Sequence, residues 1–118
     1  MLAQYLDLTD EFNNNRGEVK FETSSYDYAV VQIIGQNKPI LFLSTIDNGA
    51  IQSVTDGNIL TSVNYYIAYA TRLSDGVIVN DSSGGNGLYR FNVVGRYIKL
   101  SSNAGQVDKL LVMLTKIS

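Results

Sequence analysis

The residues that could perform chemistry in this chain are few. Its 118 residues include no histidine, cysteine or tryptophan, which excludes His-dependent nucleophiles, Cys/His zinc sites, iron–sulfur clusters and disulfides. A glycosidase needs two facing carboxyl groups, and the chain has three glutamates, Glu11, Glu18 and Glu22. Glu18 and Glu22 alternate with Lys20, a pattern typical of a strand's charged, solvated face. We therefore expect neither catalytic residues nor a cofactor, and no enzyme.

Oxygen-bearing side chains that suit a calcium ion gather in the predicted loops. They are Asp47, Asn48, Asp56, Asn58, Asp75, Asp81 and Asn86. Asp and Asn also dominate ordinary turns, because their side chains replace backbone hydrogen bonds there. No spacing matches an EF-hand, so turns are favoured and no metal site is predicted, with loop-bound calcium left open. The glycines of residues 84–87 precede a strand instead of a helix, which disfavours a phosphate site.

Tyrosine is the other unusual component, with eight residues against no tryptophan. Tyr65, Tyr66 and Tyr69 share one predicted strand. They could pack in the core, anchor a protein interface or stack on sugar rings. With the apolar residues near the N-terminus, they form our set of candidate interface residues: Leu2, Tyr5, Leu6, Phe12, Tyr65, Tyr66 and Tyr69.

Two-residue alternation of apolar and polar side chains predicts β-strands through most of the chain. The expected strands cover residues 18–23, 26–34, 40–45, 51–55, 62–73, 77–79, 88–94, 96–101 and 107–117. Residues 26–34 are apolar on both faces, which predicts a central strand covered on each side. Leu110, Leu111 and Leu114 would also suit a helix, but β-branched neighbours favour a strand at the C-terminus.

Turns between these strands recur about every 8–12 residues, at Gly, Asn and Asp, including residues 47–49 and 56–58. Together they predict an all-β fold, a single-domain antiparallel sandwich or jelly roll of about eight or nine strands over residues 18–118. Gly95 is expected at a bulge or bend, and residues 80–87 as the most mobile loop. Residues 1–17 are interpreted as an N-terminal arm that docks on a neighbouring subunit, or as a first strand or helical turn, followed by a polar hinge.

Charge and hydropathy bear on the partners. Nine basic against eleven acidic residues give a net charge of −2, and the basic residues are scattered, which argues against nucleic-acid binding. No run approaches the roughly 18–20 apolar residues that span a bilayer, so no membrane association is expected. The N-terminus lacks the pattern of a secretory signal, which predicts synthesis in a cytoplasm.

Residues 87–100, GLYRFNVVGRYIKL, precede a small turn and a last apolar strand, and residues 40–49 read ILFLSTIDNG. This pattern resembles a small β-sandwich module of tailed-bacteriophage head-decoration, tail and fibre proteins. Asn48 and the missing tryptophan depart from it. The resemblance implies a virion structural protein, most specifically a capsid-decorating head auxiliary subunit that associates with capsid proteins and with itself. A carbohydrate-binding module of a tail or fibre protein, with a glycan ligand, is the alternative.

Overall fold

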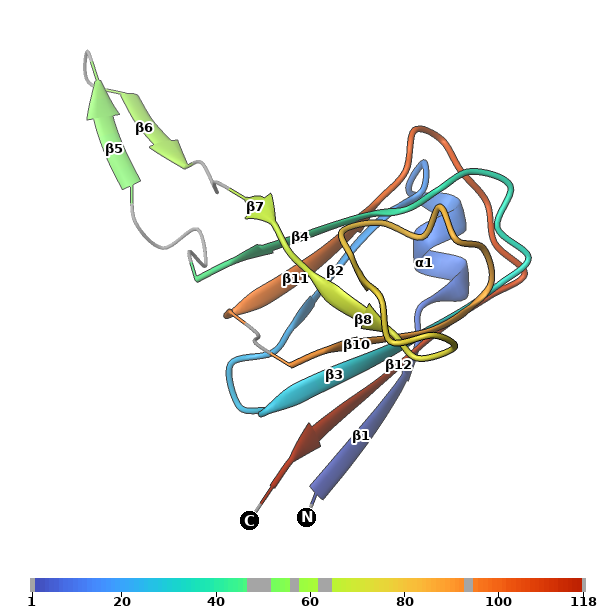
Figure 1. Cartoon of the computed structure of the whole chain (residues 1–118). Helices are drawn as coiled ribbons and strands as arrows, with labels where there is room; N and C mark the ends of the chain where they lie inside the picture. The colour runs from blue at the N-terminus through green and yellow to red at the C-terminus, as the bar shows by residue number, and fades with distance from the viewer. Residues whose placement is uncertain (1, 47–51, 56–57, 62–64, 93–94, 118) are drawn as a thin grey trace.

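The computed structural model describes residues 2–46, 52–55, 58–61, 65–92 and 95–117, and only the backbone of residues 52–55 and 58–61. Two antiparallel sheets form a sandwich, as predicted (Figure 1). Sheet A contains six strands in the order β1 (Leu2–Asp7), β12 (Lys109–Lys116), β3 (Tyr28–Ile34), β10 (Gly87–Phe91), β8 (Ala70–Arg72) and β9 (Ile78–Val79). Sheet B contains four, in the order β2 (Glu18–Glu22), β11 (Tyr97–Ser101), β4 (Leu41–Thr45) and β7 (Tyr66–Ile67).

Three of the described elements, two strands and a helix, lie outside the sheets of the sandwich. Strands β5 (Gln52–Thr55) and β6 (Asn58–Thr61) pair with each other in a separate two-stranded sheet, which projects from the sandwich in Figure 1. Helix α1 (Thr9–Asn14) lies at one end of the sandwich. Among the residues described, no helix has the length and apolar character to cross a bilayer. The turn predicted at residues 47–49 and the first two residues of the turn at 56–58 lie outside the described residues.

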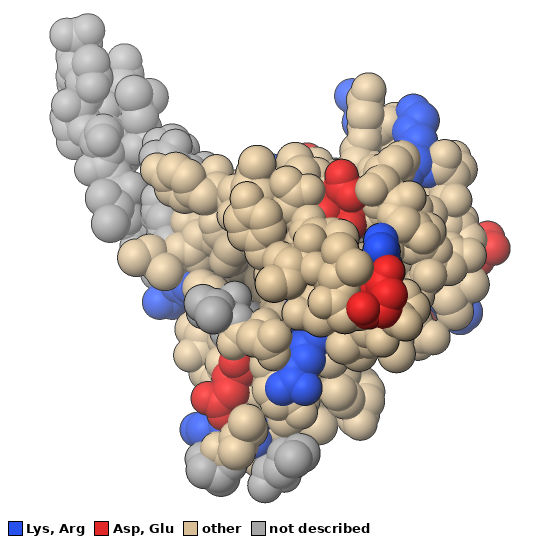
Figure 2. Space-filling view, in the orientation of Figure 1, with Lys and Arg blue, Asp and Glu red and all other residues tan. Residues whose placement is uncertain are grey.

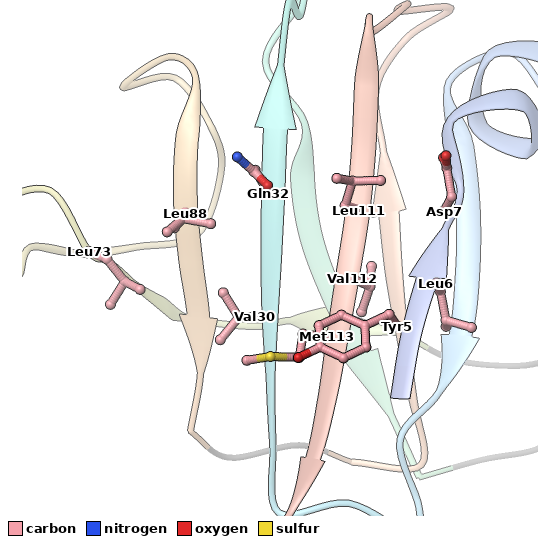
Figure 3. A pocket seen from close by; sticks show the side chains of 10 residues that line it. All are labelled: Tyr5, Leu6, Asp7, Val30, Gln32, Leu73, Leu88, Leu111, Val112 and Met113. Atoms are coloured by element: carbon pink, nitrogen blue, oxygen red, sulfur yellow. The ribbon is translucent and has the colours of Figure 1, made fainter. Parts of the chain in front are cut away.

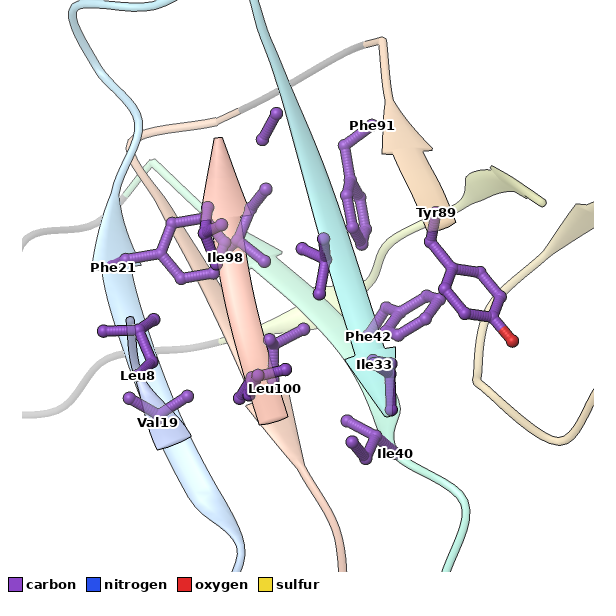
Figure 4. Close-up of a cluster of buried hydrophobic side chains, with 14 of the residues drawn as sticks. Leu8, Val19, Phe21, Ile33, Ile40, Phe42, Tyr89, Phe91, Ile98 and Leu100 are labelled. Atoms are coloured by element: carbon purple, nitrogen blue, oxygen red, sulfur yellow. The ribbon is translucent and has the colours of Figure 1, made fainter. Parts of the chain in front are cut away.

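The core follows from the alternation of the strands. Along β3 every second side chain, including Val31 and Ile33, points inward and is fully buried. Phe42 from sheet B meets Tyr89 and Phe91 from sheet A edge-to-face, at ring-centroid distances of 5.3 and 5.1 Å (Figure 4). Such contacts between aromatic rings stabilise a pair beyond the area that it buries. These rings therefore join the two sheets.

Several predicted strands are confirmed by the structure. Strand β2 keeps Val19 and Phe21 in the core and Lys20 exposed, as expected for a strand with one solvated face. The C-terminal segment is a strand, β12, and not a helix. Strand β3 is central in its sheet, between β12 and β10.

The single strand predicted over residues 62–73 is wrong. The chain forms β7 in sheet B and β8 in sheet A, so it crosses from one sheet to the other between them. The Ala68 amide still donates to Phe42 O at 2.9 Å, whereas Ala70 pairs with Val79. Both alanines are buried. Period-two alternation continues through the crossing, so the pattern does not reveal the change of sheet.

The predicted strands 88–94 and 96–101 also lie in different sheets, as β10 and β11. Gly95 sits at this crossing against sheet B, where Arg96 N donates to Thr45 O at 2.7 Å. A Cβ on Gly95 would lie 2.6 Å from Thr45 O, closer than real contacts allow. Close backbone approach therefore requires glycine at this position.

The N-terminal segment is part of the same sandwich. Strand β1 pairs antiparallel with β12, from Leu2 opposite Lys116 to Asp7 opposite Leu111. Helix α1 follows and buries Phe12 completely. The predicted interface role of Phe12 is therefore corrected: its ring fills the core because α1 folds back onto the end of the sheets.

Residues 80–87, expected to be the most mobile loop, are tied to the sandwich by hydrogen bonds. Ser82 is fully buried and its hydroxyl accepts from Ile40 N at 2.7 Å and donates to Gln36 Oε1. Ser82 N donates to Ile40 O at 2.9 Å. The Tyr89 hydroxyl donates to Gly85 O at 2.7 Å. The many glycine and serine residues of this segment suggested a mobile loop, but Ser82 and Gly85 form hydrogen bonds with specific partners in the sandwich.

Candidate interaction face

The candidate site is the outer face of sheet A, on the side away from the core. Strand alternation places Val30 and Gln32 of β3 on this face, beside Leu111 and Met113 of β12 and Leu88 of β10. A groove of about 540 Å³ lies here, which we call the outer groove (Figure 3). Its lining consists of Tyr5, Leu6, Asp7, Val30, Gln32, Leu73, Leu88, Leu111, Val112 and Met113.

The strand register explains how residues far apart in sequence meet in the outer groove. Tyr5 lies opposite Met113, and Met113 lies opposite Val30, so one row crosses three strands. The next row runs from Asp7 through Leu111 and Gln32 to Leu88. In Figure 3 the Tyr5 ring extends from β1 toward Met113.

The outer groove is apolar and uncovered within the described chain. Tyr5 is 74% exposed, Leu73 46% and Leu88 41%. The sequence predicted that strand 26–34 would be covered on each side, but the described residues bury its inner face fully and leave its outer face partly exposed. A contiguous, partly exposed apolar surface commonly marks an interaction site. The two-sided apolar pattern of β3 is thus the sequence signal for this site.

Polar groups border the outer groove. The Arg90 guanidinium stacks over the Tyr28 ring, 4.0 Å from its centroid, on the same face as Val30. At the other end, the Asp7 carboxylate accepts from Thr9 N at 3.1 Å and Thr9 Oγ1 at 2.6 Å. These hydrogen bonds lower the pKa of Asp7 below its ordinary value of 3.8. Asp7 is the one charged residue in the lining and is already hydrogen-bonded.

Two of the glutamates considered for catalysis face away from the outer groove, in sheet B. Glu18 forms an ion pair with Lys99 at 2.8 Å. Glu22 accepts from Ser24 Oγ at 2.7 Å and lies 4.0 Å from Arg96. Both occupy the exposed side of β2, where they alternate with Lys20. The third, Glu11, is an exposed residue of helix α1.

Where the structure describes the side chains considered for calcium, their oxygens accept hydrogen bonds from nearby protein groups. Asp75 accepts from Arg72 Nη2 at 2.6 Å and from Val77 N at 3.1 Å, and the Arg72 bond lowers the pKa of Asp75. Asn86 Oδ1 accepts from Gly35 N, and Asp81 Oδ1 from Ser83 N. In the described part of the chain, no three acidic side chains gather as metal ligands. The others lie outside it (Asp47, Asn48, Asp56) or are described only in their backbone (Asn58).

The predicted interface residues lie on different parts of the structure and do not form one surface. Tyr5 and Leu6 line the outer groove, and Leu2 is exposed on β1. Tyr66 and Tyr69 are 72% and 63% exposed, at and after the edge strand β7 of sheet B. Tyr65 is half-buried, with Lys99 Nζ 5.0 Å from its ring centroid. The sequence reasoning missed most of the groove: Val30, Leu73, Leu88, Leu111 and Met113.

The surface charge is dispersed on the face shown in Figure 2. Lys and Arg side chains occur there in small groups among acidic residues, and most of the visible described surface is uncharged. A nucleic-acid site requires a concentrated basic patch. No such patch is visible on this face.

Comparison with protein-family models and with curated protein sequences gives no match. Among solved structures, the chain is similar to the crystal structure of the SPBc2 prophage-derived protein YomS, with a TM-score of 0.63 and 10% sequence identity. The similarity covers 96% of this chain and 91% of that chain. It extends over nearly the whole sandwich and establishes a shared fold.

Proposed function

We propose that this protein is a non-enzymatic structural subunit of a bacteriophage particle, most specifically a head auxiliary protein that decorates the capsid. It would bind neighbouring capsid proteins after synthesis in the host cytoplasm and remain in the virion. The uncovered apolar outer groove is the observation that carries the proposal. The fold shared with a prophage-derived protein supports the link to phages.

The lining of the outer groove suits protein binding. Leu88 of β10, Val30 of β3 and Met113 of β12 present neighbouring apolar side chains on three adjacent strands, and the Arg90–Tyr28 stack borders them. Protein interfaces commonly combine an apolar centre, enriched in aromatic residues and methionine, with a polar rim. Burying one such side chain fully contributes about 1.5–3 kcal/mol. Several together would hold a partner without a cofactor.

The test is binding to purified phage particles that lack the protein. We expect Leu88→Lys to abolish binding, because it places a charge in the apolar groove. The control is Ile78→Lys, which adds the same charge at a 69% exposed residue of β9, outside the groove. Equal binding by both variants and the unsubstituted protein would contradict a role for the groove. Hundreds of copies per native particle would support decoration, whereas a dozen or fewer would indicate a tail or fibre component.

A carbohydrate-binding module is the second candidate, because Tyr66 and Tyr69 are largely exposed. Tyrosine rings in such positions can stack on sugars. A glycan array would identify a ligand, and Tyr66→Ala with Tyr69→Ala should then remove binding while Leu88→Lys retains it. An array with no ligand would eliminate this candidate.

A further inference from the structure

The edges of the two sheets differ in how they avoid pairing with other chains. An open edge strand exposes unpaired backbone groups, and natural proteins protect such edges by shortness, charge or proline. Edge strands β9 and β7 have two residues each. Edge strand β2 carries Glu18, Lys20 and Glu22. These three edges are therefore protected.

Edge strand β1 is long and unprotected by comparison. It has six residues, LAQYLD, with one charged residue, Asp7, and no proline, glycine or lysine. Residues 2–5 are all exposed, including Leu2 at 66% and Tyr5 at 74%. Its inner side is bordered by Tyr26, whose hydroxyl donates to Gln4 Oε1. No described strand lies beyond β1 in sheet A.

We propose that a second copy of this chain pairs with the β1 edge, β1 against β1 and antiparallel, about a two-fold axis near Tyr5. The two six-stranded sheets would become one continuous sheet. The biological purpose of this pairing rests on the proposed function, because a decorating subunit associates with its neighbours. A self-complementary edge is what a two-fold interface requires.

The register supports a second copy as the occupant. A two-fold axis perpendicular to the sheet keeps both outer faces on the same side, so residues on the same face must pair. With the axis at Tyr5, Tyr5 faces its equivalent, Gln4 faces Leu6, and Ala3 faces Asp7. The single charged residue then lies opposite alanine and not opposite another carboxylate. Like charges directly opposite one another would destabilise the pair.

The pairing would also join the two outer grooves. Tyr5 lines the groove at its β1 end and is mostly exposed. Two Tyr5 rings would meet across the axis, where directly opposite aromatic side chains in antiparallel strands make favourable contacts. The apolar surface would then run without interruption from one copy to the next.

Two measurements test the pairing. Sedimentation velocity should show a dimer, twice the 13.0 kDa of one chain, whereas Tyr5→Lys should sediment as a monomer because two ammonium groups would face each other. Ile78→Lys, the same change on β9, should remain a dimer. Circular dichroism checks that each variant is folded. A monomeric unsubstituted protein at every concentration measured would overturn the inference.

Cross-linking tests the register, even if Tyr5→Lys fails to fold. The chain has no cysteine, so Tyr5→Cys introduces a single thiol. Opposite Cα atoms in antiparallel strands lie about 4.5–5.5 Å apart, within disulfide range. With oxidised glutathione, Tyr5→Cys should form a disulfide dimer at least about tenfold faster than Ile78→Cys. Equal rates would overturn the pairing.

The outcomes separate the two proposals. If the protein is monomeric but still binds phage particles through the outer groove, the β1 pairing is wrong and the proposed function stands. If it dimerises through β1 but binds no particle, the proposed function is wrong and the pairing stands.

Discussion

At the scale of single residues, Thr9 holds three elements together. Its hydroxyl accepts from Leu110 N of β12 at 2.9 Å and donates to Asp7 Oδ1 at the end of β1 at 2.6 Å. Thr9 itself begins helix α1. One hydroxyl therefore satisfies a strand amide and orients the carboxylate that precedes the helix.

Thr9→Val should lower the free energy of unfolding by about 1–3 kcal/mol, because it leaves the Leu110 amide without its acceptor. Urea denaturation measures the change. Thr9→Ser retains the hydroxyl and should stay much closer to the unsubstituted protein. Equal stability of the valine and serine variants would show that the Thr9 hydroxyl does not contribute to the free energy of unfolding.

Asp75 should make stability sensitive to acid. Hydrogen bonds from Arg72 and the Val77 amide lower its pKa below 3.8 in the folded state. A lowered pKa means that the contribution is present above the unfolded-state pKa and is lost as pH falls through the folded-state value. Asp75→Asn should therefore lose less stability than the unsubstituted protein between about pH 5 and pH 2.5. Denaturation at each pH gives the free energy of unfolding of both proteins. If the two free energies fell by the same amount as the pH is lowered, the prediction would be contradicted.

At the scale of elements, residues 80–87 show how composition can mislead. The segment NDSSGGNG has the residues of a flexible linker. Its fully buried Ser82 nevertheless bonds to Ile40 and Gln36, and Phe42 N donates to Asn80 O at 3.0 Å. The partners are about 40 positions away in the chain, so no local pattern could reveal them.

Ser82→Ala should cost about 1–3 kcal/mol, because the Ile40 amide and the Gln36 side chain each lose a buried partner. Hydrogen exchange should accelerate at the Ile40 amide in particular. Ser83→Ala changes an exposed neighbour and should leave that amide protected. Equal exchange in both variants would contradict an anchoring role for Ser82.

At the scale of the whole molecule, the two faces of sheet A have different roles. The inner face packs on sheet B, and the outer face carries the outer groove. Neighbouring residues of β12 illustrate the difference, since Leu110 is fully buried while Leu111 lines the groove. Folding therefore depends on one face, and the proposed association depends on the other.

Leu110→Ala should destabilise the protein by about 2–5 kcal/mol, as expected for a large core side chain. Leu111→Ala removes the same atoms from the groove and should cost clearly less, because Leu111 is only partly buried. Denaturation of both variants at a concentration where the protein is monomeric makes the comparison. A larger cost at Leu111 would mean that the outer face is covered.

The sequence by itself determined several of the strands and, for β2, the face that points inward, because alternation along a strand is a local property of the chain. β2, β3 and β12 were predicted in this way, and so was the sandwich. The sequence also showed that β3 is apolar on both faces, but it did not show that the outer face lines a groove.

Only the tertiary structure decided which sheet each strand joins, because strand pairing depends on hydrogen bonds between residues far apart in the chain. The crossings after β7 and β10 and the anchoring of Ser82 belong to this class. So does the outer groove, where β1, β12, β3 and β10 meet from opposite ends of the sequence. A side chain's type is local, but whether another element covers it depends on the whole fold.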